Sequence, residues 1–133
     1  MTPAVRYMIL CEAATADPLR PEVMNISYLM SSITSREDPP YPLVHKSILI
    51  FLILTNCRGR GVARFRVIDA DDEQQRELSH SPDFHLDFTN RDPLELVGVP
   101  FRLKRLRFPR AGTYRVQFWY NSDMVEERLL RLK

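Results

Sequence analysis

The sequence lacks an apolar segment long enough to cross a membrane. Its longest unbroken apolar run is Ile48–Leu54, whereas a membrane-spanning helix needs about 20 residues. The apolar residues Tyr7–Cys11 near the N-terminus are interrupted by Glu12, so we expect no signal peptide. These absences predict a cytoplasmic protein that makes no contact with a membrane.

Cysteine is scarce, and neither sign of charge is in large excess. The 133 residues include two cysteines, Cys11 and Cys57, each in or beside an apolar segment typical of a strand. In a reducing compartment this predicts two buried thiols rather than a disulfide, and no Cys/His spacing suits zinc. With 19 Lys and Arg against 17 Asp and Glu, the formal charge of +2 does not by itself indicate a nucleic-acid or membrane ligand.

Glycine is also rare. The chain has four glycines and ten prolines, and no stretch repeats apolar residues convincingly at helical spacing. A chain of this size can bury about two thirds of its unfolded surface, so we expect one domain over residues 1–133. Near-regular strands with turns between them predict an all-β, immunoglobulin-like antiparallel β-sandwich of seven to nine strands. The expected strands are 5–13, 23–33, 43–55, 61–69, 74–78, 83–88, 96–108, 113–121 and 124–132.

Alternation of apolar and polar residues identifies the expected core. The core-facing residues on this basis are Ala63, Phe65, Val67, Phe84, Leu86, Phe88, Tyr114, Val116, Phe118 and Tyr120. The alternation slips between Leu103 and Leu106, which we attribute to a β-bulge or to a strand that leaves one sheet for another, at a sheet edge or corner. The run Ile48–Leu54 does not alternate and needs cover on both faces. We expect the core on one side, and a partner or the Pro-rich loop at 38–42 on the other.

Longer motifs point to a family as well as to a fold. Phe108–Val116 is typical of the corner before the sixth strand of immunoglobulin-like sandwiches, where the Tyr114 hydroxyl bonds to upstream backbone. Together with other segments it resembles a family of small bacterial proteins known only as a domain of unknown function. The segments that carry the resemblance are Arg6–Glu12, Thr55–Gly61, Phe65–Asp71, Phe101–Phe108 and Ala111–Asn121. The resemblance implies a bacterial, single-domain β-sandwich and supplies no catalytic residues.

The charges are unevenly distributed, which suggests a candidate binding face. Residues 96–133 carry a net +6, residues 69–95 a net −7 and residues 1–68 a net +3. In an immunoglobulin-like sheet, Arg64, Arg66, Arg115 and Trp119 could share an outward face, with Arg128 nearby. Such a face could hold phosphates and stack on a base. The alternative is a solvated face whose arginines pair with acids on neighbouring strands, with Trp119 covered by a loop or an adjacent layer.

Two other constellations resemble ligand sites incompletely. Asp69–Glu73 resembles the first half of a calcium loop, but it lacks the required Gly and the distant Glu, so a polar hairpin turn is favoured. His80, Asp83, His85 and Asp87 lack a further nitrogen or sulfur ligand, which favours ordinary surface residues. We therefore expect no metal and no cofactor.

The sequence contains no motif that specifies catalysis. No nucleophile elbow, phosphate loop or dinucleotide fingerprint occurs, and Arg58–Gly61 favours a hairpin loop with a positive-φ glycine over an anion nest. We expect a non-catalytic protein-interaction module that contacts another protein or a second copy through Ile48–Leu54 and Trp119. The alternative is a polyanion or nucleic-acid binder that uses the basic face, and an enzyme is the weakest interpretation.

Overall fold

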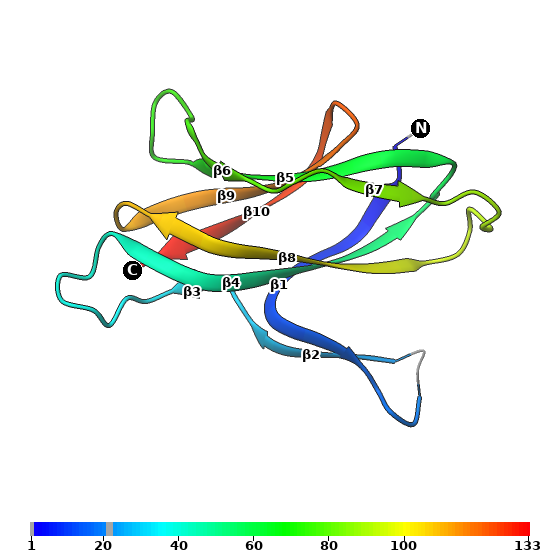
Figure 1. Ribbon diagram of the computed structural model, residues 1–133, viewed down its shortest axis with the longest axis horizontal. Coiled ribbons are helices and arrows are strands. Elements are labelled where there is room, and N and C mark those ends of the chain that lie inside the picture. The colour runs from blue at the N-terminus through cyan, green and yellow to red at the C-terminus, as the bar shows by residue number, and fades with distance from the viewer. Residues whose placement is uncertain (1, 21–22) are drawn as a thin grey trace.

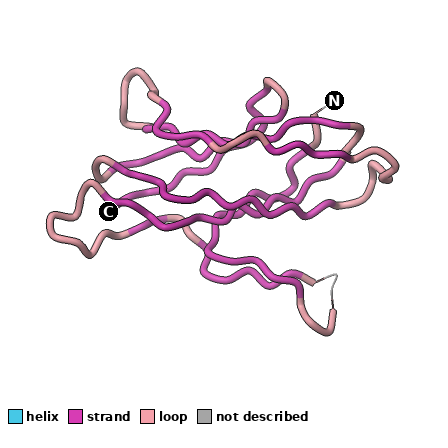
Figure 2. Tube along the Cα trace, in the orientation of Figure 1, coloured by secondary structure: helices cyan, strands magenta, loops and turns pink. Residues whose placement is uncertain are grey.

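The computed structural model describes residues 2–20 and 23–133, and its regular elements are all strands (Figure 2). They are β1 (Ala4–Ala16), β2 (Met24–Leu29), β3 (Ser32–Ile33), β4 (Leu43–Thr55), β5 (Arg60–Asp69), β6 (Glu77–His80), β7 (Phe84–Asp87), β8 (Val97–Phe108), β9 (Gly112–Tyr120) and β10 (Asp123–Leu132). One sheet has the order β2-β1-β4-β8 and the other β3-β10-β9-β5-β6, with β7 also paired to β5. The two sheets lie face to face (Figure 1), which confirms the all-β sandwich. The described residues include no helix that could cross a membrane.

The strand count differs slightly from the prediction. The expected strand at 23–33 is divided into β2 and the two-residue β3, because the chain leaves β1 at Met30 and pairs β3 in parallel with the end of β10. The strands β6 and β7 lie one after the other along β5, so together they act as one interrupted strand. The described residues thus form ten strands, against the seven to nine expected.

Aromatic rings fill the space between the sheets. The Phe65 ring centroid lies 4.9 Å from that of Phe101 on β8 and 5.4 Å from that of Phe118 on β9. Because Phe101 belongs to one sheet and the other two rings belong to the opposite sheet, these contacts join the layers. The predicted inward face of β9 is confirmed, since its four apolar residues are all fully buried. Phe84 and Leu86 are half-buried and pack against this core.

The outer face of β4 is covered by the chain itself. Leu49 and Phe51 point away from the core cluster, yet they are only 5% and 3% exposed. After Cys11, β1 leaves β4 and crosses this face, and Arg102 Nη2 of β8 donates a hydrogen bond to the Glu12 carbonyl at 3.4 Å. The β1–β2 arm, which comprises residues 12–20 and 23–29, continues beneath the sheet (Figure 1). Neither a partner nor the Pro-rich loop supplies this cover, which corrects the prediction.

The slip in alternation along β8 has a local cause. Arg105 adopts a left-handed backbone conformation with φ of 55°, and it separates the buried residues Leu103 and Leu106. β8 remains paired with β4 in one register from Val97 to Phe108. The strand therefore contains neither of the two expected features, a β-bulge or a change of sheet, although it does form the edge of its sheet.

The corner before β9 has the predicted geometry. The Tyr114 ring is fully buried, and its hydroxyl donates a hydrogen bond of 2.7 Å to the Arg110 carbonyl. Burial raises the pKa of the Tyr114 hydroxyl and the Arg110 hydrogen bond opposes this rise, so the group stays a neutral donor at physiological pH. Both cysteines are free and buried, as expected.

Removal of the corner hydrogen bond should cost stability without changing the fold. Tyr114→Phe keeps the buried ring but deletes the hydroxyl donor, so we expect the free energy of unfolding to fall by about 1 kcal/mol. Urea unfolding followed by intrinsic fluorescence measures this change. An unchanged midpoint would show that water replaces the hydroxyl at no cost.

Gly61 should tolerate no side chain. A Cβ at Gly61 would overlap the fully buried Tyr120 ring, whereas a Cβ at Gly59 would meet nothing within 4 Å. We expect Gly61→Ala to destabilise the protein by about 3 kcal/mol through overpacking, and Gly59→Ala by only about 1 kcal/mol through its φ of 64°. Thermal unfolding of both variants makes the comparison, and equal losses would contradict the assignment of close packing to Gly61.

Candidate functional site

The structure brings together four of the five residues of the predicted binding face. Arg64 pairs with Trp119 across β5 and β9, and Arg66 and Arg115 extend the same outer face of the six-stranded sheet. Arg128 lies on the opposite face, because it pairs with the core residue Val116. A register shift between Met124 and Glu126 reverses the faces of the rest of β10, and this irregularity explains the misplacement of Arg128.

Acidic side chains neutralise the arginines of this face. Three ion pairs join neighbouring elements: Arg64 with Asp83 at 3.9 Å, Arg66 with Glu77 at 2.7 Å and Arg115 with Glu127 at 2.7 Å. This is the arrangement of the solvated alternative, in which cross-strand acids satisfy the cations. The face therefore offers little uncompensated charge to a polyanion.

Trp119 is half-buried and is also engaged within the face. The guanidinium carbon of Arg66 lies 5.0 Å from the centroid of its ring, a cation–π geometry. Its indole Nε1 donates a hydrogen bond of 3.0 Å to Gln117 Oε1. Two side chains of the same face, Arg66 and Gln117, thus contact the indole.

The ion pair of Arg66 changes the titration of Glu77. Burial acts to raise the pKa of Glu77, but the hydrogen bond and the charge of Arg66, with a contribution from His80, outweigh it and leave the pKa below its ordinary value of 4.5. The stability that the Glu77 carboxylate contributes is therefore fully present above the pKa that Glu77 has in the unfolded chain. It is lost as the pH falls through the lower pKa that Glu77 has in the folded protein.

The acidic turn after β5 is joined by hydrogen bonds to the corner before β9. Asp69 Oδ2 accepts a hydrogen bond of 2.7 Å from Arg110 Nη2, and its Oδ1 accepts one from the Asp71 amide. The second carboxylate, Asp71, accepts a hydrogen bond from the Thr113 amide at 3.0 Å. These oxygens, which resembled calcium ligands in the sequence, join the β5–β6 turn to the corner before β9.

The predicted cluster near β6 and β7 does not come together: His80, Asp83 and Asp87 contact separate partners, and His85 is exposed on β7. His80 Nδ1 lies 3.5 Å from Glu77, whereas Asp87 accepts a hydrogen bond of 2.6 Å from Thr89 Oγ1. Asp83 pairs with Arg64. Among the described residues, no group of three His, Cys, Asp or Glu side chains has the geometry to hold a metal ion.

The structure reveals an apolar groove that the sequence analysis did not predict. It lies where β1 and β10 approach each other from the two sheets, and its volume is about 400 Å³. Its lining includes Met8, Leu10, Leu29, Met30, Arg128 and Leu129. Leu29 is 73% exposed. Leu129 is 57% exposed and pairs with Arg115, so it lies on the outer face of its sheet and borders the groove at the edge of β10. The one predicted residue that the structure separates from the basic face, Arg128, thus lines the groove.

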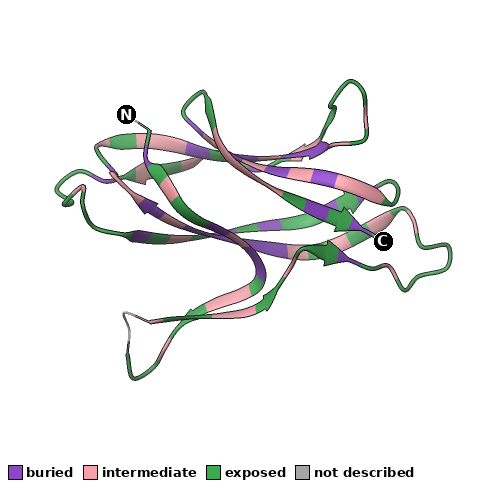
Figure 3. Ribbon diagram, turned by 180° about the vertical axis from the view of Figure 1, so that it is seen from behind, coloured by how far each residue is buried: buried purple, intermediate pink, exposed green. Residues whose placement is uncertain are grey.

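Unpaired strand edges border this groove. β1 pairs with β2 only from Cys11 onward, and β10 pairs with β3 only at Arg131 and Leu132. Within the described part of the chain, no strand pairs with the outer edges of residues 4–9 and 123–130. Figure 3 shows the contrast between the buried strands of the sandwich and the mostly exposed β1–β2 arm beside the groove. No local pattern signals such a groove, because it forms between strands far apart in the sequence.

Comparisons with known proteins identify a family. The model of DUF6941, a family of unknown function, matches residues 6–133, which confirms the resemblance to an uncharacterised family. No curated protein matches the chain. Among solved structures, the chain is similar to a β-glucosidase from Listeria innocua crystallised in complex with isofagomine, with 10% identity and a TM-score of 0.44. That match covers 98% of this chain but only 16% of the glucosidase, and similarity at this level does not indicate a shared activity.

Removal of the Glu77 carboxylate should affect stability only where it is ionised. At pH 7 we expect Glu77→Gln to lower the free energy of unfolding by up to about 1 kcal/mol, the usual worth of an exposed ion pair. At pH 3 the carboxylate is increasingly protonated, so the difference between the two proteins should shrink. Denaturant unfolding at the two pH values tests this, and a difference that persists unchanged at pH 3 would contradict it.

Proposed function

We propose that this chain, which belongs to the DUF6941 family of unknown function, is a non-catalytic protein-interaction module of the bacterial cytoplasm. Its contact surface is the apolar groove between β1 and β10. The observation that carries the proposal is the coincidence of exposed apolar side chains with unpaired strand edges on one side of the sandwich. Edges of this kind readily pair with another chain unless charge or cover protects them.

The chemistry of the groove suits a protein partner. Leu129 and Leu29 present apolar surface, and Tyr7, the residue of β1 that precedes the lining residue Met8, is an aromatic residue that is 57% exposed. A ring with a polar tip is the residue type that dominates binding energy at protein interfaces. Unpaired backbone groups of β1 and β10 could also bond to an extended segment of the partner.

The absence of a catalytic role and the cytoplasmic location belong to the same proposal. Two acids near β5 and β6, Glu77 and Asp83, form ion pairs with arginines, and His80 Nδ1 lies 3.5 Å from Glu77. These contacts leave the acids poorly suited to acid–base chemistry. Free and buried Cys11 and Cys57 support a reducing compartment.

The earlier expectation for Trp119 stays a prediction. Because Arg66 and Gln117 already contact its indole, Trp119 supports a partner contact less well than the groove does. The outer face of Ile48–Leu54 supports it even less, since Leu49 and Phe51 are already buried within the chain. The polyanion alternative loses support for a similar reason, because the arginines beside Trp119 are paired with acids.

Site-specific photo-cross-linking tests the proposal. A photoreactive residue is placed at Leu129 in the groove, at Trp119 on the basic face, or at Leu94, a loop residue that is 86% exposed and serves as the matched control. We expect a discrete cross-linked protein at position 129, both resistant to nuclease and displaced by excess unlabelled protein. Cross-linking of purified protein, with light scattering, distinguishes a second copy from a different partner.

The pattern across the three positions decides the outcome. A product at position 129 that is absent at position 94 supports the groove. Equal products at both positions indicate non-specific adhesion of exposed apolar residues, and a product only at Trp119 assigns the contact to the basic face. Either of these results would overturn the groove as the contact surface.

A further inference from the structure

The edge strand β8 has an unpaired side far from the groove between β1 and β10. β8 is the last strand of its sheet and pairs along its length with β4 alone. No backbone hydrogen bond to another described segment occupies its other side between 102 and 107. A strand edge of this kind presents free N–H and C=O groups to an incoming extended chain.

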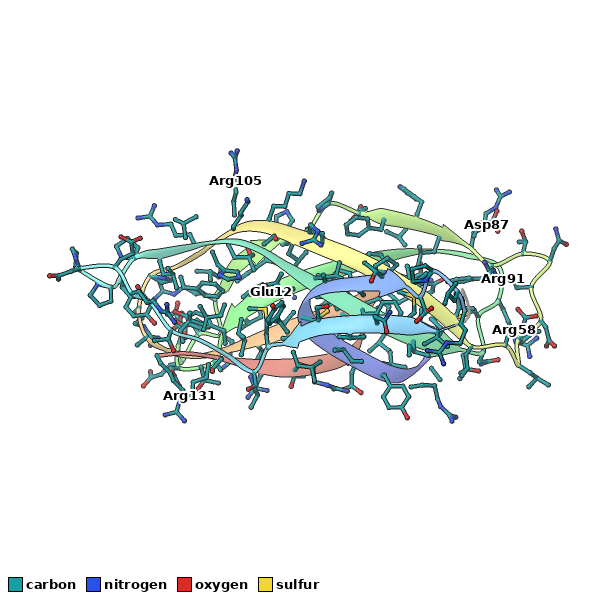
Figure 4. All side chains as sticks on the ribbon, turned by 90° about the horizontal axis from the view of Figure 1, so that it is seen from below. Glu12, Arg58, Asp87, Arg91, Arg105 and Arg131 are labelled. Carbon is teal, nitrogen blue, oxygen red and sulfur yellow. The ribbon has the colours of Figure 1, made fainter. Side chains whose placement is uncertain are left out.

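Cations that lack ion-pair partners cluster at this edge. Arg102, Lys104 and Arg107 lie on the outer face of the sheet, with Lys46 on β4 nearby. Arg105, whose left-handed backbone interrupts the alternation, projects away from the β8 ribbon (Figure 4). All five side chains are exposed, and none forms an ion pair with a carboxylate of the described residues. Arg102 donates neutral hydrogen bonds, at 3.0 Å to Ser47 Oγ and at 3.4 Å to the Glu12 carbonyl, so its positive charge stays uncompensated.

An apolar cavity opens beside the same stretch of β8, on its inner side. The cavity has a volume of about 290 Å³ and lies between β8 and the β6 end of the other sheet. Leu103 and Leu106 of β8, Phe65 and Val67 of β5, and Pro82 form its apolar lining. Arg102 and Lys104 of β8 and the polar residues Ser79, His80 and Ser81 complete the lining. The β8 edge thus combines exposed cations with an adjacent cavity whose deeper lining is apolar.

We propose that β8 binds an extended acidic segment of a partner protein by strand addition. Successive side chains of an added strand point to opposite faces of the sheet. Acidic side chains of the segment would meet Arg102, Lys104 and Arg107 on the outer face, and the apolar side chains between them would enter the cavity beside Leu103 and Leu106. Backbone hydrogen bonds supply affinity and the alternate side chains supply specificity.

Charge complementarity selects this occupant over the others. A second copy that added its own β8 would place two rows of cations side by side, which is unfavourable. A nucleic acid would satisfy the cations but would offer neither peptide groups to the free backbone nor alternate apolar groups to the cavity. The same cations disfavour the pairing of β8 with neutral apolar strands. They therefore make β8 selective for acidic strands.

A synthetic peptide tests the inference directly on the full chain. The probe is a short, end-capped peptide that alternates glutamate and valine, and its binding is measured by calorimetry, with amide shifts mapped by NMR. We expect saturable binding that weakens as salt rises, with shifts at 102–107. The double variant Lys104→Glu/Arg107→Glu should bind at least about tenfold more weakly. The matched control Arg131→Glu, an exposed cation on the opposite side of the molecule (Figure 4), should bind normally.

Altered probes separate strand addition from simple charge attraction. A peptide N-methylated at alternate amides keeps its charge but loses backbone donors, and we expect it not to bind; a lysine–valine peptide should not bind either. Binding of the N-methylated peptide, or of a single-stranded oligonucleotide in place of the acidic peptide, would overturn the proposal, as would no binding at low salt. Leu129→Lys should leave peptide binding unchanged. The peptide experiment and the cross-linking experiment at the groove therefore test two separate surfaces.

Discussion

The need to bury both faces of β4 determines much of this structure. Its inner face packs against the aromatic rings of the opposite sheet, as in any sandwich. Its outer face, with Leu49 and Phe51, is covered because β1 leaves the sheet after Cys11 and crosses beneath it. That divergence has two consequences: the β1–β2 arm extends beyond the sandwich, and the edges of β1 and β10 are left unpaired beside an apolar groove.

The position of the acids explains why the two sheets differ in charge. The acidic stretch of the chain folds as β6 and the turns beside β5, so its carboxylates reach the arginines of β5. β8 lies in the other sheet, and its strand partner β4 contributes apolar side chains and one cation, Lys46. Its cations therefore have no acidic partner among the described residues, although β8 and β9 belong to the same basic stretch of the sequence.

Local patterns predicted the strands and the core well, and they failed where one residue changes the phase. Period-two alternation gave the correct inward face of β9, because that strand is regular throughout. In β10, a register shift near Met124 turned Arg128 from the outer face to the groove. In β8, the left-handed backbone of Arg105 breaks the alternation of apolar and polar residues, which in the sequence resembled the effect of a β-bulge. A single-residue irregularity leaves no clear mark in the sequence, yet it reverses every side chain that follows it.

The all-β class, the core residues, the corner at Tyr114 and the free thiols follow from the order of the amino acids, because each depends on residues close in the chain or on composition. The pairing of charges, the cover of Leu49 and Phe51, and the positions of open strand edges among the described residues emerge only once the chain has folded. These features depend on which strands become neighbours across the two sheets. That choice is set by burial of the whole core rather than by any local pattern.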